Sequence, residues 1–412
     1  MKISPAPHCF KGSKYLFAYT FTVHKPSWRE FISYWTKFGF LSFGGPVAQI
    51  GMLHRDLVEN KRWLDEDEFS QALSFVSILP GPEAHQLATY IGRKHFGFIG
   101  GVLAGGLFLL PSLFIISGLT WLYLEYSTTT NIDDVLDGLR AGVLGLILYT
   151  TYRLSIKIKW DWKYIAIAMT FLILGSVFSI PIIALVFIAL VISYLLARSV
   201  QSTPSDALTW KPTLKPLGIG FLIWLMSFFL VFQSEELRNI ATLFTQAALI
   251  TFGGAYSVVP FVSEAAVGQY GWLTQSQMLD GIALGETTPG PLIMINAFVG
   301  FIAFQGFIGA LTATWFTFLP SFVLVFAGAP IMAAITKNHR MKSALAILNV
   351  VVITFIAGFA IQIFQDLNSD TRLTQVLFAL ISFVLLIKTK IPLIAQLFLI
   401  TLLYVGMTIL IN

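Results

Sequence analysis

Long apolar stretches alternate with short polar ones along almost the whole chain. A membrane-spanning helix needs ~20 apolar residues, and the pattern predicts about thirteen such hydrophobic elements. The first six cover 28–51, 68–92, 98–124, 135–153, 162–178 and 180–197. A lone element covers 216–232, and six more cover 240–262, 276–303, 307–334, 343–364, 373–387 and 391–411. The pattern therefore predicts an all-α polytopic membrane protein.

Composition supports this prediction. Hydrophobic residues make up 56% of the 412 residues and charged residues only 11%, against ~25% charged in soluble domains. This excludes a water-soluble enzyme, a nucleic-acid-binding domain and a disordered chain. The single cysteine, Cys9, allows no internal disulfide or cysteine metal site. We find no nucleotide-binding, zinc-peptidase or serine-hydrolase motif. We therefore expect no enzyme activity, no cofactor and no resident metal.

The distribution of Lys and Arg predicts the topology. Residues 1–27 form a basic tail without the features of a signal peptide, and we place this tail in the cytoplasm by the positive-inside rule. The same rule places the carboxyl terminus outside. The expected organisation is listed from the amino end: the tail, a first repeat at 28–197, a cytoplasmic linker at 198–215, a single span at 216–232 and a second repeat at 236–412.

An internal repeat underlies this division. Three motif pairs are each separated by 209 positions: Ser42-Phe43-Gly44-Gly45 and Thr251-Phe252-Gly253-Gly254, Pro80-Gly81-Pro82 and Pro289-Gly290-Pro291, and Leu110-Pro111-Ser112 and Leu319-Pro320-Ser321. The loop near 125–137 is acidic, whereas the equivalent loop at 337–342 is basic. The two repeats should therefore be inverted relative to each other, as in many secondary transporters.

The Gly-Gly and Pro-Gly-Pro motifs should break their helices, as full spans or as re-entrant hairpins. The N-terminus of a half-helix carries free N–H groups and attracts anions. We expect four such ends around one cavity that binds an anion; the plainer alternative is a set of loop turns. The candidate binding residues are Ser42, Gly44, Gly45, Pro46, Pro80, Gly81, Pro82, Gln86, Thr251, Gly253, Gly254, Thr288, Pro289, Gly290, Pro291 and Asn296.

Ionisable residues near the breaks are candidates for proton coupling. Glu83, His85 and Glu286 are in this group, although the glutamates could instead cap half-helices or pair with Arg55, and His85 could be a satisfied polar group. Arg55 and Arg140 could attract the anion, and Arg140 could instead snorkel to the membrane surface. The GxxxG spacings at Gly101 and Gly105 and at Gly138 and Gly142 favour helix packing.

The motifs resemble those of the long-chain chromate transporter (CHR) family over about residues 28–411. The resemblance is carried by the segments 40–46, 79–92, 251–256 and 286–294. It implies a carrier in the bacterial cytoplasmic (inner) membrane that expels chromate, driven by the proton motive force, with sulfate as a competitor. His85, where Gln or another polar residue is expected, and Ala255, opposite Pro46 of the first half, depart from the pattern.

Other functions stay open. The fold could transport sulfate or another oxyanion, inward or outward, or act as a channel. A membrane enzyme on a lipid-linked phosphate also needs an anion site, but no nucleophile or metal cluster is visible. The expected partners are chromate, sulfate, protons and the lipid bilayer, with no nucleic acid; a homo-oligomer is compatible with the sequence.

Overall fold

The computed structural model describes residues 23–126, 133–178, 180–197, 211–252, 254–367, 371–389 and 391–411, and these contain helices and no strand. The first half has α1 (Trp28–Leu41), α2 (Gly45–His54), α3 (Glu66–Val76), α4 (Glu83–Tyr126), α5 (Asp133–Ser155), α6 (Trp162–Ser176) and α7 (Ile182–Ala197). Next is α8 (Lys211–Val231). The second half has α9 (Glu235–Ile250), α10 (Val259–Ser263), α11 (Gln275–Thr287), α12 (Ile295–Phe304), α13 (Phe307–Gly328), α14 (Met332–Lys337), α15 (His339–Asp366), α16 (Arg372–Lys388) and α17 (Leu393–Ile411).

Several helices are long and apolar enough to cross a membrane. They are Glu83–Tyr126, Lys211–Val231, Phe307–Thr336, Ser343–Asp366 and Leu393–Leu410. The all-α, multi-pass membrane class is confirmed by these helices.

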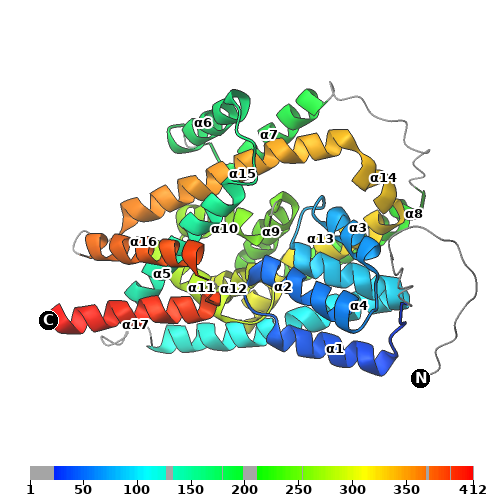
Figure 1. Cartoon of the computed structure of the whole chain (residues 1–412), viewed down its shortest axis with the longest axis horizontal. Helices are drawn as coiled ribbons and strands as arrows, with labels where there is room; N and C mark the ends of the chain where they lie inside the picture. The colour runs from blue at the N-terminus through cyan, green and yellow to red at the C-terminus, as the bar shows by residue number, and fades with distance from the viewer. Residues whose placement is uncertain are drawn as a thin grey trace, which may run out of the picture.

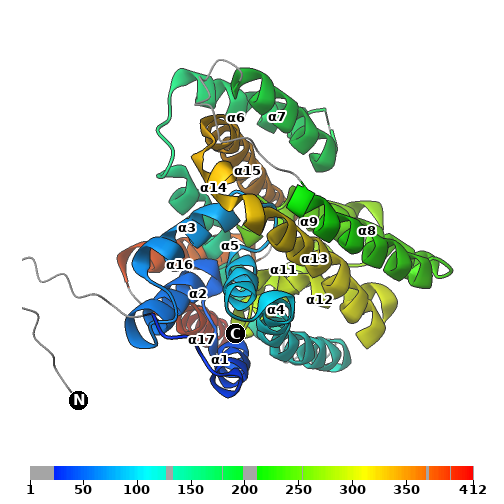
Figure 2. The ribbon, with the colours of Figure 1, turned by 90° about the vertical axis from the view of Figure 1, so that its right-hand side faces the viewer.

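The lone helix α8 lies at the edge of the molecule (Figure 2). It packs on α9 and α13 along one side, and its other side leaves Phe229 76% and Leu230 83% exposed. Helix α8 begins at Lys211, five residues before the predicted apolar span 216–232. A proline in the first helical turn is compatible with a helix, so Pro212 does not delay the start of the helix.

The predicted elements are broken into shorter helices. The stretch 28–51 is interrupted between α1 and α2, where Gly44 has a φ of +94°. The stretch 68–92 is interrupted between α3 and α4. Within α4 the backbone leaves helical geometry at Phe96 and Gly97. The two arms of α4 then pack tightly, since a Cβ on Gly92 would overlap the carbonyl oxygen of Gly100.

The elements recur at the offset of 209 residues that the motifs show. Helix α3 begins at Glu66 and α11 at Gln275. A π-helical segment at Arg55–Asn60 has its counterpart at Glu264–Gln269. Helices α5, α6 and α7 correspond to α15, α16 and α17. The repeat therefore extends over the described helices on both sides of α8.

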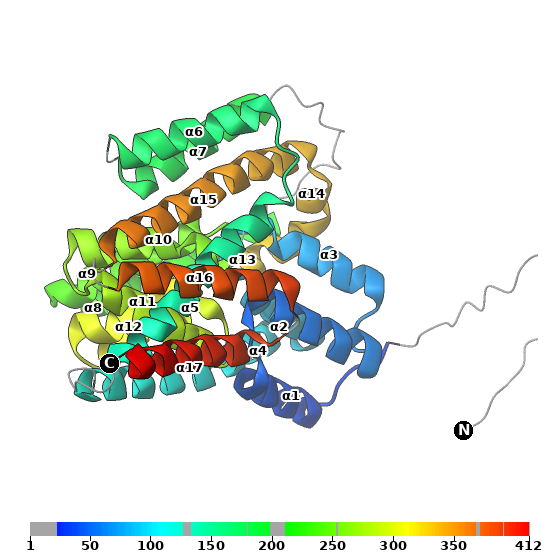
Figure 3. The ribbon, with the colours of Figure 1, turned by 60° about the vertical axis from the view of Figure 1, so that its left-hand side comes forward.

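The two halves are intertwined by reciprocal contacts. Helix α5 packs against α16 and α17 of the second half, and α15 packs against α6 and α7 of the first. Figure 1 accordingly shows α5 near α16 and α17, away from α1 and α3. Figure 3 shows α15, α16 and α17 side by side as successive passes of the chain, with α6 and α7 beyond α15. Such reciprocity is typical of two copies related by a two-fold axis.

Small residues permit this packing, as predicted for the GxxxG spacings. A Cβ on Gly138 would lie 3.0 Å from Cα of Thr401 in α17, and one on Gly142 would lie 2.8 Å from a methyl group of Leu397. A Cβ on Gly105 would lie 2.5 Å from the ring of Phe322 in α13. The assignment of these glycines to packing faces is confirmed.

Candidate functional site

The helix breaks of the two halves are joined by reciprocal hydrogen bonds. The backbone N–H of Gly81 donates to the carbonyl oxygen of Thr251 at 2.8 Å, and the N–H of Gly290 donates to the carbonyl oxygen of Ser42 at 2.9 Å. Each bond thus links the Pro-Gly-Pro loop of one half to the Gly-Gly loop of the other. The side chain of Gln49 adds two donations from Nε2, at 3.0 Å to the Ser42 oxygen and at 2.5 Å to the Gly290 oxygen.

The Pro-Gly-Pro loops are packed rather than open. A Cβ on Gly290 would lie 2.6 Å from Cβ of Ser112, and one on Gly81 would lie 3.4 Å from Oγ of Ser321, the residue equivalent to Ser112. The side chain of Gln86 braces the first loop by donating to the Pro80 oxygen at 2.7 Å. The second-loop residues are all buried: Thr288, Pro289, Gly290 and Pro291. These loops form a joint between the halves.

A cavity of about 790 Å³ lies beside this joint. At ~30 Å³ per molecule of liquid water it has room for an oxyanion with much of its hydration shell. Its walls come from the start of α2, the break between α3 and α4, the second half of α5, α15 and the loop after α9. Five of the predicted binding or coupling residues line it: Gly44, Gly45, Pro46, Glu83 and Gly254. Gly253 lies outside the described residues.

The N-terminus of α2 faces this cavity. Gly44 caps the helix through its left-handed backbone, no side chain caps it, and Pro46 follows in the first turn. Gly44, Gly45, Pro46 and Val47 all line the cavity. The uncapped N–H groups and the positive end of the helix dipole are therefore available to an anion.

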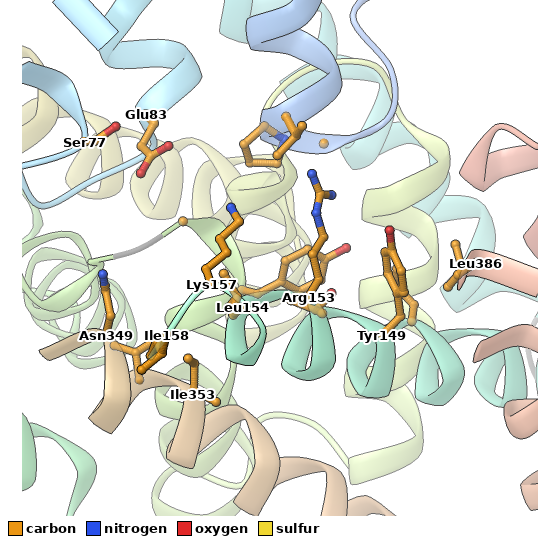
Figure 4. A pocket seen from close by; sticks show the side chains of 18 of the residues that line it. Ser77, Glu83, Tyr149, Arg153, Leu154, Lys157, Ile158, Asn349, Ile353 and Leu386 are labelled. Carbon is orange, nitrogen blue, oxygen red and sulfur yellow. The ribbon is translucent and has the colours of Figure 1, made fainter. Parts of the chain in front are cut away.

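Three cations line the cavity. Arg153 lies in the last turn of α5, and Lys157 and Lys159 follow that helix. Figure 4 shows Arg153, Lys157 and Tyr149 projecting to the same side, with Glu83 across the cavity. None of the three cations has a salt bridge within the described part of the chain. With Glu83 as the only lining carboxylate among the described residues, the formal charge of the wall is +2.

In the sequence alone these cations have another meaning. A cluster of Lys and Arg after an apolar helix is commonly an orientation signal under the positive-inside rule. The four-residue spacing of Arg153 and Lys157 was the available hint, because it places both on one side of a continued helix. These two cations become candidates for anion binding only in the folded protein, where α2 and α15 form the opposite wall of the cavity.

A buried carboxylate lies behind the cavity wall. Glu286 is 2% exposed and accepts a short hydrogen bond from the hydroxyl of Tyr256. Tyr256 lines the cavity together with Thr150, whereas Glu286 does not. Glu83 lies in the first turn of α4, where the helix dipole stabilises a negative charge.

The other polar candidates lie inside the protein, away from the cavity. His85 is buried between the rings of Phe318 and Phe322, and its Nδ1 lies 3.2 Å from Oγ of Ser321. Asn296 donates from Nδ2 to Thr317 at 3.0 Å.

The two arginines expected to attract an anion lie elsewhere. Arg55 is 61% exposed and lies 3.6 Å from Asp56, with neither Glu83 nor Glu286 as its partner. Arg140 forms an ion pair with Asp280 and does not line the cavity. No group of three or more metal-binding side chains occurs among the described residues.

The fold and the cavity define a multi-pass α-helical membrane protein of two intertwined repeats with a cationic cavity between them. The family profile described as "Chromate transporter" matches residues 29–194 and 238–408, two segments whose starts are again 209 residues apart. The chain belongs to this chromate transporter family.

Curated relatives agree with this membership. The chain is 35% identical over 349 residues to a chromate transport protein of Pseudomonas aeruginosa, covering 82% of this chain and 81% of the relative. It is 32% identical to a probable chromate transport protein of Synechococcus elongatus, over 81% and 83% of the two chains. It is 29% identical to a chromate transport protein of Cupriavidus metallidurans, over 88% of each. No solved structure matches the chain significantly.

Proposed function

We propose that this protein is a secondary transporter that carries chromate out of the cytoplasm and binds it in the cavity between the repeats. The names of the relatives support chromate as the substrate. The observation that carries the proposal is the joint placement of three unpaired cations and an uncapped helix N-terminus on one cavity. A wall with a formal charge of +2 matches a tetrahedral dianion, which can be chromate or sulfate.

The proposed topology follows from the charges of the loops. The cavity cations lie at the end of α5 that the positive-inside rule assigns to the cytoplasm, so the cavity would open inward. The acidic and basic loops at equivalent positions support inverted repeats, with the amino terminus inside and the carboxyl terminus outside. The reciprocal contacts between the repeats support an exchange of their roles during transport.

Proton coupling is assigned to Glu286 through Tyr256. Glu286 is shielded from the cavity by Tyr256, its hydrogen-bond donor, and Tyr256 lines the same cavity as Arg153. A proton on Glu286 would change the charge behind the anion site without occupying it. Glu83 is a second candidate because it lies in the cavity wall itself.

The binding site is tested by uptake of radioactive chromate into everted membrane vesicles. A charge-assisted hydrogen bond contributes about 1.5–3 kcal/mol, so Arg153→Gln or Lys157→Gln should raise KM roughly tenfold or more. The matched control is Lys211→Gln, which removes an exposed cation outside the cavity wall. Equal KM values for the cavity variants and the control would contradict the proposed site.

Substrate and coupling are tested in the same vesicles. Accumulation of sulfate without chromate would keep the site and change the substrate. Tyr256→Phe and Glu286→Gln should weaken the response of uptake to an imposed proton gradient more than they weaken exchange without a gradient. An unchanged gradient response in both variants would reject Glu286 as the coupling group.

A further inference from the structure

A buried ion pair joins the two repeats at a distance from the cavity. Arg140 of α5 donates from Nε and Nη2 to the two carboxylate oxygens of Asp280 in α11, both at 2.8 Å. The hydroxyl of Tyr123 in α4 donates to the same carboxylate at 2.8 Å, and Asp137 accepts from Nη1 of Arg140 at 2.8 Å. The side chain of Asp280 is 1% exposed and that of Arg140 is 17% exposed.

The ion pair lies beyond the end of the cavity that is farther from Arg153 and Lys157. Arg140 precedes Arg153 by 13 residues on α5, which corresponds to about 20 Å along the helix. The first residue of α5 that lines the cavity is Leu146, about 9 Å from Arg140 by the same rise. Val143 and Leu144, which lie between them, are buried in the core. The cavity is therefore closed at this end by packed side chains with the ion pair outside them.

The equivalent end of the other repeat is open. The offset of 209 residues pairs Arg140 with Asn349 in α15 and Asp280 with Gln71 in α3. Helix α11 packs on α5, whereas α15 and the end of α3 face each other across the cavity. Asn349 lines that cavity, and Gln71 is exposed. The cavity is thus closed at the end where α11 packs on α5 and open at the end between α3 and α15.

We propose that the Arg140–Asp280 ion pair is the gate that closes the cavity on the side away from the cations. This inference rests on the proposed transport function, because a gate has meaning only in a carrier that opens to each side in turn. When the repeats exchange roles, α11 moves away from α5 and the ion pair separates. The approach of α3 to α15 then brings Gln71 toward Asn349 and closes the cation side.

The two gates differ in strength for a chemical reason. A bidentate pair between a guanidinium and a carboxylate is roughly twice as strong as a hydrogen bond between neutral groups. Two amides can form only the neutral kind of bond. The protein therefore favours the arrangement with the ion pair formed and the cation side open. The gate residues act on the equilibrium between the two arrangements and do not contact the anion.

The test measures on which membrane face the cavity opens, without any substrate. Cys9→Ser gives a cysteine-free background, and Tyr149→Cys then places one reactive thiol in the cavity wall. A membrane-impermeant maleimide is applied to right-side-out and to everted vesicles. The gate variant is Arg140→Gln/Asp280→Asn, which removes both charges of the pair; Asp137 loses its cationic partner, but its side chain is 21% exposed to solvent. The control is Lys94→Gln/Glu68→Gln, which removes an ion pair within the first repeat.

With the gate intact, labelling should occur from one face only. The gate variant should raise labelling from the opposite face roughly tenfold, since a charge-assisted contact has been lost; the control should not. Labelling confined to the original face in the gate variant, at a normal rate, would overturn the proposal. Because labelling requires no transport, a protein that passes this test and moves no oxyanion would contradict the proposed substrate and leave the gate supported.

Discussion

Replacement of Gly290 by alanine separates a joining role of the Pro-Gly-Pro loop from a binding role. Gly290 has a φ of +100°, and an added Cβ would lie 2.6 Å from Cβ and 2.9 Å from Oγ of Ser112. Ordinary carbon contacts are ~3.5–4.0 Å, so α4 must move away from the loop by about 1 Å. Overpacking of this kind costs about 1–3 kcal/mol, and a left-handed alanine costs a further ~1–2 kcal/mol.

The expected destabilisation is therefore about 2–5 kcal/mol for Gly290→Ala. The matched control is Gly254→Ala, where φ is +110° but nothing lies within 4 Å of the added Cβ; it should show only the backbone cost of ~1–2 kcal/mol. Large domains lose roughly 2–4 °C of Tm per kcal/mol. We expect Gly290→Ala to lower the melting temperature by several degrees more than Gly254→Ala.

The assay is thermal melting of the detergent-solubilised protein, followed by the loss of the monodisperse peak on size exclusion. A second-site change provides the internal check, because Ser112→Gly removes the side chain that the added methyl group at position 290 would meet. The double variant should recover the part of the loss due to the clash. Equal melting of the Gly290 and Gly254 variants, or no recovery by Ser112→Gly, would refute the joint; loss of chromate binding without loss of stability would favour direct binding by the loop.

Two further predictions concern the joint and the membrane. Gln49→Leu should lower stability by about 1–3 kcal/mol, because two buried carbonyl oxygens lose the donor that they share; in the same melting assay, a variant as stable as the wild type would contradict this role. A fluorophore on Phe229→Cys in the cysteine-free background should be quenched strongly by brominated lipids, because this face of α8 is exposed and apolar. A probe on Trp224→Cys, whose position on α8 faces Phe316 and Thr245, should be quenched less.

The sequence alone reveals those parts of the site that depend on local backbone conformation. Gly44 and Pro46 disclose a helix break because glycine and proline act locally, through φ and the missing N–H. The uncapped start of α2 in the cavity wall follows from that break. Lys157 and Arg153 gave no comparable signal, because a cation after an apolar helix serves orientation and binding equally well.

For the Pro-Gly-Pro motifs, the sequence predicts the helix break but not its role in the fold. Their composition predicted broken helices correctly, since α4 begins after Pro82 and a new helical segment begins after Pro291. Composition could not say whether the freed backbone groups face an anion or another part of the protein. The reciprocal bonds to Thr251 and Ser42 use the N–H groups of Gly81 and Gly290 for the joint.

By itself the sequence determined the membrane class, the repeat and its register, because hydrophobic period and local backbone preferences depend on neighbours along the chain. The tertiary structure decided which residues share the cavity, which loops join the repeats, and that Arg140 pairs with Asp280 across 140 positions of sequence. Those outcomes depend on the packing of α5, a helix of the first half, against α16 and α17 of the second half. This packing is between helices far apart in the chain, which no local pattern records.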